Sequence, residues 1–118
     1  LNDAGTALEG TTVLYRQTPK VSGGQHFGSR LLFDRAGRLW ITQGDRGTPK
    51  AGDSALSQRL DATIGKVVRI ATDGTVPADN PFATRGGGAR PEIFSVGHRN
   101  AQAAAVHPAT GALWTVEH

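Results

Sequence analysis

Short apolar runs alternate with glycine and proline along most of the chain, a pattern typical of β-strands joined by turns. It predicts strands at residues 11–17, 30–34, 38–44, 67–70 and 92–97, and a hairpin within 101–118. A long polar connection follows residue 44, and Ser54 to Leu60 could form at most a short helix in it. The pattern therefore indicates an all-β protein.

Two of the predicted hairpins resemble each other. Gly37, Leu39 and Trp40 follow one apolar run, and the same three residue types recur 74 positions later, at 111, 113 and 114. Repeated short strands favour a β-propeller, in which a blade has four strands, so the chain would cover roughly two blades. The alternative is that any two hairpins with glycine turns look alike. Two blades alone leave large faces open, which indicates either a piece of a larger protein or a subunit that closes a ring with its own copies.

Composition removes several function classes. The 118 residues carry 13 Lys and Arg against 10 Asp and Glu, and the cations are spread along the chain, so we expect no nucleic-acid partner. The absence of cysteine excludes disulfides and thiolate metal sites, and no zinc signature is present, so no metal ligand is assigned. No run of about 18 apolar residues predicts a membrane span. The first ten residues lack the pattern of a signal peptide, so an exported form would already have lost it.

A histidine and an aspartate flank the first hairpin. His26 lies in the glycine-rich stretch GGQHFG, and Asp45 lies in QGDRG at the other end. Imidazole is the natural base near neutral pH, and a carboxylate that orients it would fix its tautomer. The alternatives are a solvated or turn-bonding histidine and a turn-forming aspartate. Sequence alone does not establish that the two side chains meet.

A second polar cluster, GHRNAQ, ends the strand predicted at 92–97. Arg99 offers five donors for carbonyl or carboxylate groups, and Asn100 offers a donor and an acceptor. His98 would point away from Arg99 if the strand geometry persists. His107, before a proline, is interpreted as a hairpin-turn residue. The alternative for Arg99 and Asn100 is an ordinary polar surface loop.

Five segments in order and register resemble the soluble, pyrroloquinoline-quinone (PQQ)-dependent aldose sugar dehydrogenases, the glucose/sorbosone dehydrogenase family. They are SGGQHFGSRLLFD, ITQGDRG, LDATIGKVVRIATDGTVPADNPF, PEIFSVGHRNAQ and HPATGALWTVEH. The resemblance covers about Val13 to His118. It implies a six-bladed propeller, with residues 1–118 as one partial domain of about two blades, and a site that holds PQQ over a calcium ion.

The resemblance also implies roles for individual residues. His26 resembles the base that takes the proton of the sugar's anomeric hydroxyl while its hydride passes to PQQ, and Asp45 resembles the acidic partner of that base. Arg99 and Asn100 match the pair that hydrogen-bonds the quinone carbonyl edge. The product would be a lactone, an external acceptor would receive the electrons, and the location would be periplasmic or secreted.

Two departures from the family pattern limit what the chain itself carries. Ala101, Gln102 and Ala103 stand where the family usually has Pro-Gln-Gly, and the chain stops at His118, before the Gly-Pro segment that holds calcium in the family. The isolated 118 residues are therefore not expected to turn over. The competing hypothesis is a non-catalytic β-propeller fragment, or a self-assembling module that binds a carbohydrate or a partner, with a homotrimer of two-blade chains as one possible homo-oligomer.

Overall fold

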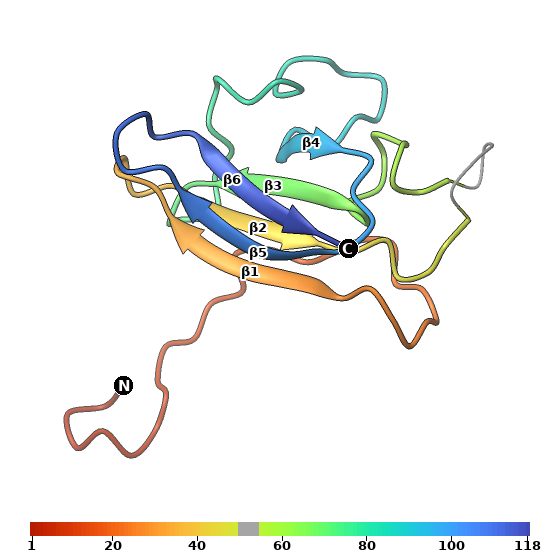
Figure 1. Ribbon diagram of the computed structural model, residues 1–118. Helices are drawn as coiled ribbons and strands as arrows, with labels where there is room; N and C mark the ends of the chain where they lie inside the picture. Colours follow the sequence, from red (N-terminus) through yellow and green to blue (C-terminus); the bar gives the residue numbers. More distant parts are fainter. Residues whose placement is uncertain (50–54) are drawn as a thin grey trace.

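The computed structural model of the chain describes residues 1–49 and 55–118, and all regular structure in these ranges is β (Figure 1). The strands are β1 (Gly28–Phe33), β2 (Leu39–Gln43), β3 (Lys66–Ile70), β4 (Ile93–Val96), β5 (Ala101–Val106) and β6 (Leu113–Glu117). The predicted all-β class is confirmed, as is the placement of every predicted strand from residue 30 onward. Within the described ranges, no helix is long and apolar enough to cross a lipid bilayer.

The strands form two antiparallel sheets, one of four strands in the order β1-β2-β3-β4 and one hairpin of β5 and β6. A four-stranded sheet in chain order has the size of one propeller blade, and the hairpin has half that size. In Figure 1, β5 lies next to β1 and β2. There Arg30 Nε donates to the carbonyl of Gln102 at 2.8 Å, and Thr42 Oγ1 donates to the carbonyl of Ala101 at 2.9 Å. The two sheets therefore pack side by side, as radial repetition requires.

Both hairpin turns depend on a glycine in the left-handed region. Gly37 has φ +76°, and its N–H donates to the carbonyl of Asp34. Gly111 has φ +73°, and its N–H donates to the carbonyl of His107. The ring of His107 also accepts backbone N–H groups of the turn, which confirms its interpretation as a turn residue. The sequence repeat is thus a structural repeat of strand, glycine turn and strand.

The core surrounds β3, in which every residue is buried. Lys66 is fully buried there, and its Nζ donates to the carbonyls of Leu56 at 2.7 Å and Ile64 at 2.8 Å. Burial lowers the pKa of Lys66 to about 8, because the charged form loses its hydration. The buried apolar residues are Trp40, Ala55, Ala62, Ile64, Val67, Val68, Ile70, Ile93 and Ala101.

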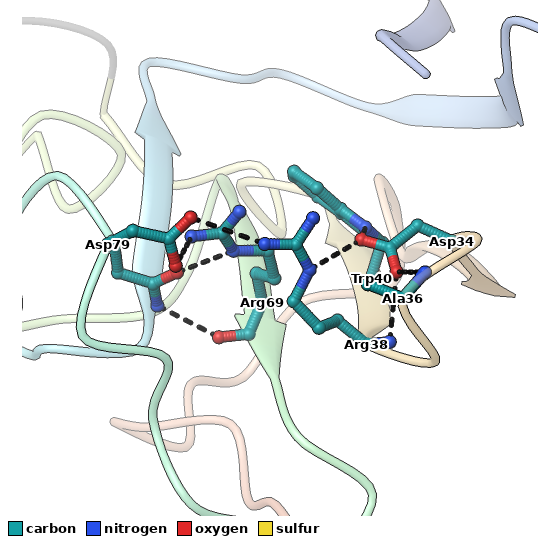
Figure 2. A network of polar contacts seen from close by, with 7 residues as sticks. Asp34, Ala36, Arg38, Trp40, Arg69 and Asp79 are labelled. Carbon is teal, nitrogen blue, oxygen red and sulfur yellow. Dashed lines mark hydrogen bonds and ion pairs between the residues drawn. The ribbon is translucent and has the colours of Figure 1, made fainter.

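Arg69, on β3, is buried between aromatic rings and forms an ion pair. Its guanidinium carbon lies 5.3 Å from the ring centroid of Trp40 and 4.8 Å from that of Phe94. One guanidinium nitrogen contacts Asp79 Oδ1 at 2.7 Å, and the other oxygen of Asp79 contacts Arg38 at 3.2 Å (Figure 2). The network joins β3, the residue before β2 and the loop after β3.

Asp34 is the second anchor of this network. Its Oδ2 accepts the indole N–H of Trp40 at 2.9 Å and Nε of Arg38 at 2.7 Å (Figure 2). Burial opposes its charge, but the hydrogen bonds from Trp40 and Arg38 outweigh burial and lower the pKa of Asp34. The Asp34 side chain therefore fixes both the turn and the core tryptophan beside it.

Two local predictions differ from the structure. Residues 11–17 form no strand, so that prediction is wrong; their contacts to the sheet run through side chains, with Tyr15 Oη bonded to the Gln43 side chain of β2. No ladder partner lies along this segment in the described ranges, and β-propensity alone does not supply one. Of the short helix considered for Ser54 to Leu60, Ser54 lies outside the described residues, and 55–60 form no helix, with turns at 56–58 and 60.

Candidate functional site

The β1-β2 hairpin brings His26 and Asp45 together. His26 lies two residues before β1 and Asp45 two residues after β2, and the pairing of Gly28 with Gln43 brings these two ends side by side. His26 Nδ1 lies 2.6 Å from Asp45 Oδ1, and the two side chains are only 11% and 4% exposed. The contact that sequence left open is therefore present.

The Asp45 contact fixes the tautomer of His26. A carboxylate only accepts hydrogen bonds, so the geometry assigns the donor role to Nδ1, and in the neutral imidazole Nε2 then keeps its lone pair. Within the described residues, Nε2 has no hydrogen-bond partner, and the ring of His118 lies nearby, with centroids 6.3 Å apart. The same Asp45 Oδ1 accepts the N–H of Gly47 at 2.8 Å, which holds the carboxylate in place. The arrangement is that of a base with an oriented imidazole.

The backbone around His26 is held in an uncommon conformation. His26 has φ +53°, a left-handed value that non-glycine residues adopt at a cost of about 1–3 kcal/mol. Gly44 allows the two loops to lie this close, because a β-carbon at residue 44 would overlap the carbonyl of His26. The Arg46 N–H also donates to that carbonyl, at 3.3 Å. The glycine at 44 thus serves the close contact of two loops.

Gly44→Ala is expected to disable the site without removing a functional group. The added methyl would push the His26 backbone away from Asp45, lowering turnover of the full-length protein roughly a hundredfold and the free energy of unfolding by about 1–3 kcal/mol. Steady-state kinetics and thermal melting measure both. Gly24→Ala is the matched control, because no atom lies within 4 Å of a β-carbon there, and it should leave both values unchanged. Equal behaviour of the two variants would show that the loop contact does not matter.

Arg99 and Asn100 join this hairpin through the connection from β4 to β5. The Asp45 N–H donates to the Arg99 carbonyl at 2.8 Å, and the Gly28 N–H donates to Asn100 Oδ1 at 2.9 Å. Asn100 is buried. The four predicted site residues therefore lie in one web of hydrogen bonds. In this web the side-chain oxygen Oδ1 of Asn100 already accepts a hydrogen bond from the loop that carries His26.

The side chain of Arg99 is the unpaired member of this web. Its Nε is buried and has no hydrogen-bond partner among the described residues. A buried donor without a partner costs free energy, and such atoms in native proteins commonly mark a ligand site. Arg99 therefore fits an electron-rich ligand such as a quinone carbonyl. No group of three or more metal-ligating side chains lies in 1–49 or 55–118.

Sequence reasoning missed Glu117 and the side-chain partners of His98. Glu117 Oε2 contacts His98 Nδ1 at 2.8 Å, and His98 Nε2 contacts Ser95 Oγ at 2.8 Å. The strand geometry on which the separation of His98 from Arg99 was predicted ends at Val96, and both residues contact Glu117, His98 through its ring and Arg99 through its backbone N–H. The repeat contains one signal that could have pointed to Glu117. With the offset of 74, Glu117 is the equivalent of Gln43, so a polar side chain ends the second strand of each hairpin.

Comparisons with known proteins agree with this geometry. The sequence profile of the family described as Glucose / Sorbosone dehydrogenase matches residues 1–118. The aldose sugar dehydrogenase YliI of Escherichia coli (strain K12) is 45% identical over 105 residues, which are 89% of this chain and 27% of that protein.

Solved structures give the same result. A glucose dehydrogenase matches with a TM-score of 0.88 and 43% identity over 100% of this chain and 35% of that one. The PQQ-bound form of an aldose sugar dehydrogenase from Streptomyces coelicolor matches with a TM-score of 0.64 and 32% identity, over 80% of this chain and 25% of that one. The chain therefore spans about a third or less of the proteins it resembles, and the predicted β-propeller fold is confirmed.

Proposed function

Because the chain belongs to the glucose/sorbosone dehydrogenase family, we propose that it carries one half of the active site of a PQQ-dependent aldose dehydrogenase. The reaction would oxidise the anomeric hydroxyl of an aldose to a lactone. The observation that carries this proposal is the contact of His26 with Asp45, which leaves Nε2 of a nearly buried imidazole free to accept a proton.

His26 would act as the general base. Its Nε2 would take the proton of the anomeric hydroxyl, which pushes the electrons of that oxygen toward the carbonyl being formed. Asp45 would hold the reactive tautomer and stabilise the imidazolium that results, since its carboxylate lies 2.6 Å from Nδ1. The burial of both side chains keeps bulk water from competing for these hydrogen bonds.

Arg99 and Asn100 would hold the cofactor. Arg99 fits this role because its buried Nε lacks a partner and its charge complements an oxygen that becomes more negative on reduction. Asn100 would contribute the N–H₂ group of its side-chain amide, because Oδ1 of that amide already accepts the Gly28 N–H. PQQ, when bound, supplies the acceptor for the hydride of the sugar.

The remaining features of the proposal concern the full-length protein. We place the calcium ligands on residues that follow His118, and we take residues 1–118 as a partial propeller domain of about two blades. A periplasmic or secreted location and an external electron acceptor agree with this chemistry. The support is the family membership and the likeness to a PQQ-bound structure.

Dye reduction by the full-length protein tests the function. The protein is incubated with PQQ and calcium, and reduction of an artificial acceptor is followed with several aldoses, with controls that lack PQQ, calcium or sugar. Activity that requires all three is expected. Bound PQQ without reduction of the dye by any aldose would contradict the proposal.

The same assay on the 118-residue chain separates the two hypotheses for this segment. Activity that requires both PQQ and calcium would mean that self-assembly supplies the other half of the site. No activity from folded protein would place the chemistry in a longer chain, with these residues as one half of the site.

A further inference from the structure

Glu117, at the end of β6, uses both carboxylate oxygens on the segment that carries Arg99. Oε1 accepts the backbone N–H of Arg99 at 2.5 Å, and Oε2 contacts His98 Nδ1 at 2.8 Å. The pairing of Ala101 with Glu117 places the end of β6 beside the start of β5, so the side chain reaches back over residues 98 and 99. Glu117 is thus a cross-strand clamp on the connection from β4 to β5.

The Glu117 carboxylate is itself well anchored. The other ring nitrogen of its partner His98 contacts Ser95 Oγ at 2.8 Å. The backbone N–H of His98 donates to the carbonyl of Gly65 at 3.0 Å. Burial opposes the charge of Glu117, but the bonds from Arg99 and His98 outweigh burial and lower the pKa of Glu117. The clamp is therefore a charged acceptor at neutral pH, which makes the bond to the Arg99 N–H a strong one.

Both backbone polar groups of Arg99 are hydrogen-bonded, whereas its side chain, within the described part of the chain, is not. The N–H of Arg99 is held by Glu117, and its carbonyl is held by the N–H of Asp45. In 1–49 and 55–118, no acceptor receives a hydrogen bond from its guanidinium, and Nε is buried without a partner. A fixed backbone with a free cationic side chain is the arrangement of a preorganised ligand-binding residue.

We propose that Glu117 is a positioning residue that holds Arg99 in place for the carbonyl edge of PQQ. The inference rests on the proposed function, and it deepens it by adding a residue that touches neither sugar nor cofactor. Because the Arg99 carbonyl is bonded to the amide of Asp45, the clamp also ties the cofactor side of the site to the partner of His26. Loss of Glu117 would therefore loosen Arg99 first.

The test is PQQ binding by the full-length protein, measured by titration of the absorbance of the cofactor. Glu117→Ala is expected to raise the dissociation constant of PQQ about tenfold, the usual effect of losing one charge-assisted hydrogen bond. Glu117→Gln should recover most of the affinity, since its amide oxygen still accepts the Arg99 N–H. Glu9→Ala is the matched control, because Glu9 is exposed, and it should not change the affinity.

Hydrogen exchange of a peptide containing residue 99 provides a second measurement that does not depend on PQQ. Glu117→Ala should speed exchange of the Arg99 amide in apo protein, and Glu117→Gln should restore its protection. If Glu117→Ala does not fold, weakened PQQ binding by folded Glu117→Asp, whose side chain is one methylene shorter, supports the same conclusion.

The outcomes separate the two proposals. Wild-type affinity and wild-type Arg99 exchange in folded Glu117→Ala, with sugar oxidation intact, overturn the positioning role alone. A wild-type protein that binds no PQQ and oxidises no aldose overturns the proposed function and, with it, the ligand assigned to Arg99. Weaker PQQ binding with rescue by glutamine supports both.

Discussion

Replacing His26 by alanine in the full-length protein is expected to lower turnover by roughly two to four orders of magnitude, the usual loss when a general base is removed. The expectation follows from geometry: Asp45 holds Nδ1 at 2.6 Å, so Nε2 is the basic atom and its loss leaves only water to accept the proton. The measurement is the steady-state turnover number with saturating aldose and dye. The dissociation constant of PQQ should stay within a few-fold of wild type, because Arg99 and Asn100 are untouched.

Two further variants define what that loss means. Asp45→Asn removes the carboxylate that selects the tautomer, and turnover should fall by a comparable amount, since the wrong ring nitrogen would then carry the proton. His107→Ala is the matched histidine control, because its ring serves a hairpin turn and it should leave turnover unchanged. Unchanged turnover in His26→Ala would remove His26 from the mechanism.

The second large effect concerns stability. Trp40→Ala is expected to lower the free energy of unfolding by about 3–5 kcal/mol, a large part of the 5–15 kcal/mol that holds a typical domain folded. Trp40 is 5% exposed, packs edge-on against Phe94 with centroids 4.6 Å apart, and donates its indole N–H to Asp34. Its loss would open a cavity and leave the charge of Arg69 without one of its rings. Chemical denaturation of the full-length protein measures the change.

Trp40→Phe separates the ring from its hydrogen bond. The smaller aromatic ring keeps the contact with Phe94 and gives up the bond to Asp34, so a cost of about 1–2 kcal/mol is expected. A Trp40→Ala variant that unfolds within 1 kcal/mol of wild type would show that the core is formed elsewhere.

The fold could be predicted from the sequence where local chemistry decides it. Gly37 and Gly111 enforce tight turns, and the apolar runs beside them can then only pair as hairpins. Residues 11–17 show the limit, because their β-branched and apolar side chains satisfy strand propensity while no strand of the described chain forms a ladder with them. Pairing depends on distant residues that propensity does not contain.

The site shows the same division. The residue types of His26 and Asp45 could be identified from their glycine-rich surroundings, but their contact depends on the register of β1 with β2. The role of Glu117 could not be predicted from sequence, because it ends β6 while its partner Arg99 lies 18 positions earlier, in the connection from β4 to β5. The burial of Arg69 likewise could not be predicted, because Trp40, Phe94 and Asp79, which contact its guanidinium, come together only in the folded chain.

The repeat also gives the chain two optical reporters in contrasting surroundings. Trp40 is enclosed by the core, whereas its counterpart Trp114 is 65% exposed on β6 and stacks on His107 with ring centroids 5.7 Å apart. Indole emission shifts to longer wavelengths in water, and collisional quenchers reach only an accessible ring. Quenching by acrylamide would therefore select Trp114 in the 118-residue chain. A loss of that quenching in a longer chain or on self-association would report directly that a neighbouring surface has covered β6.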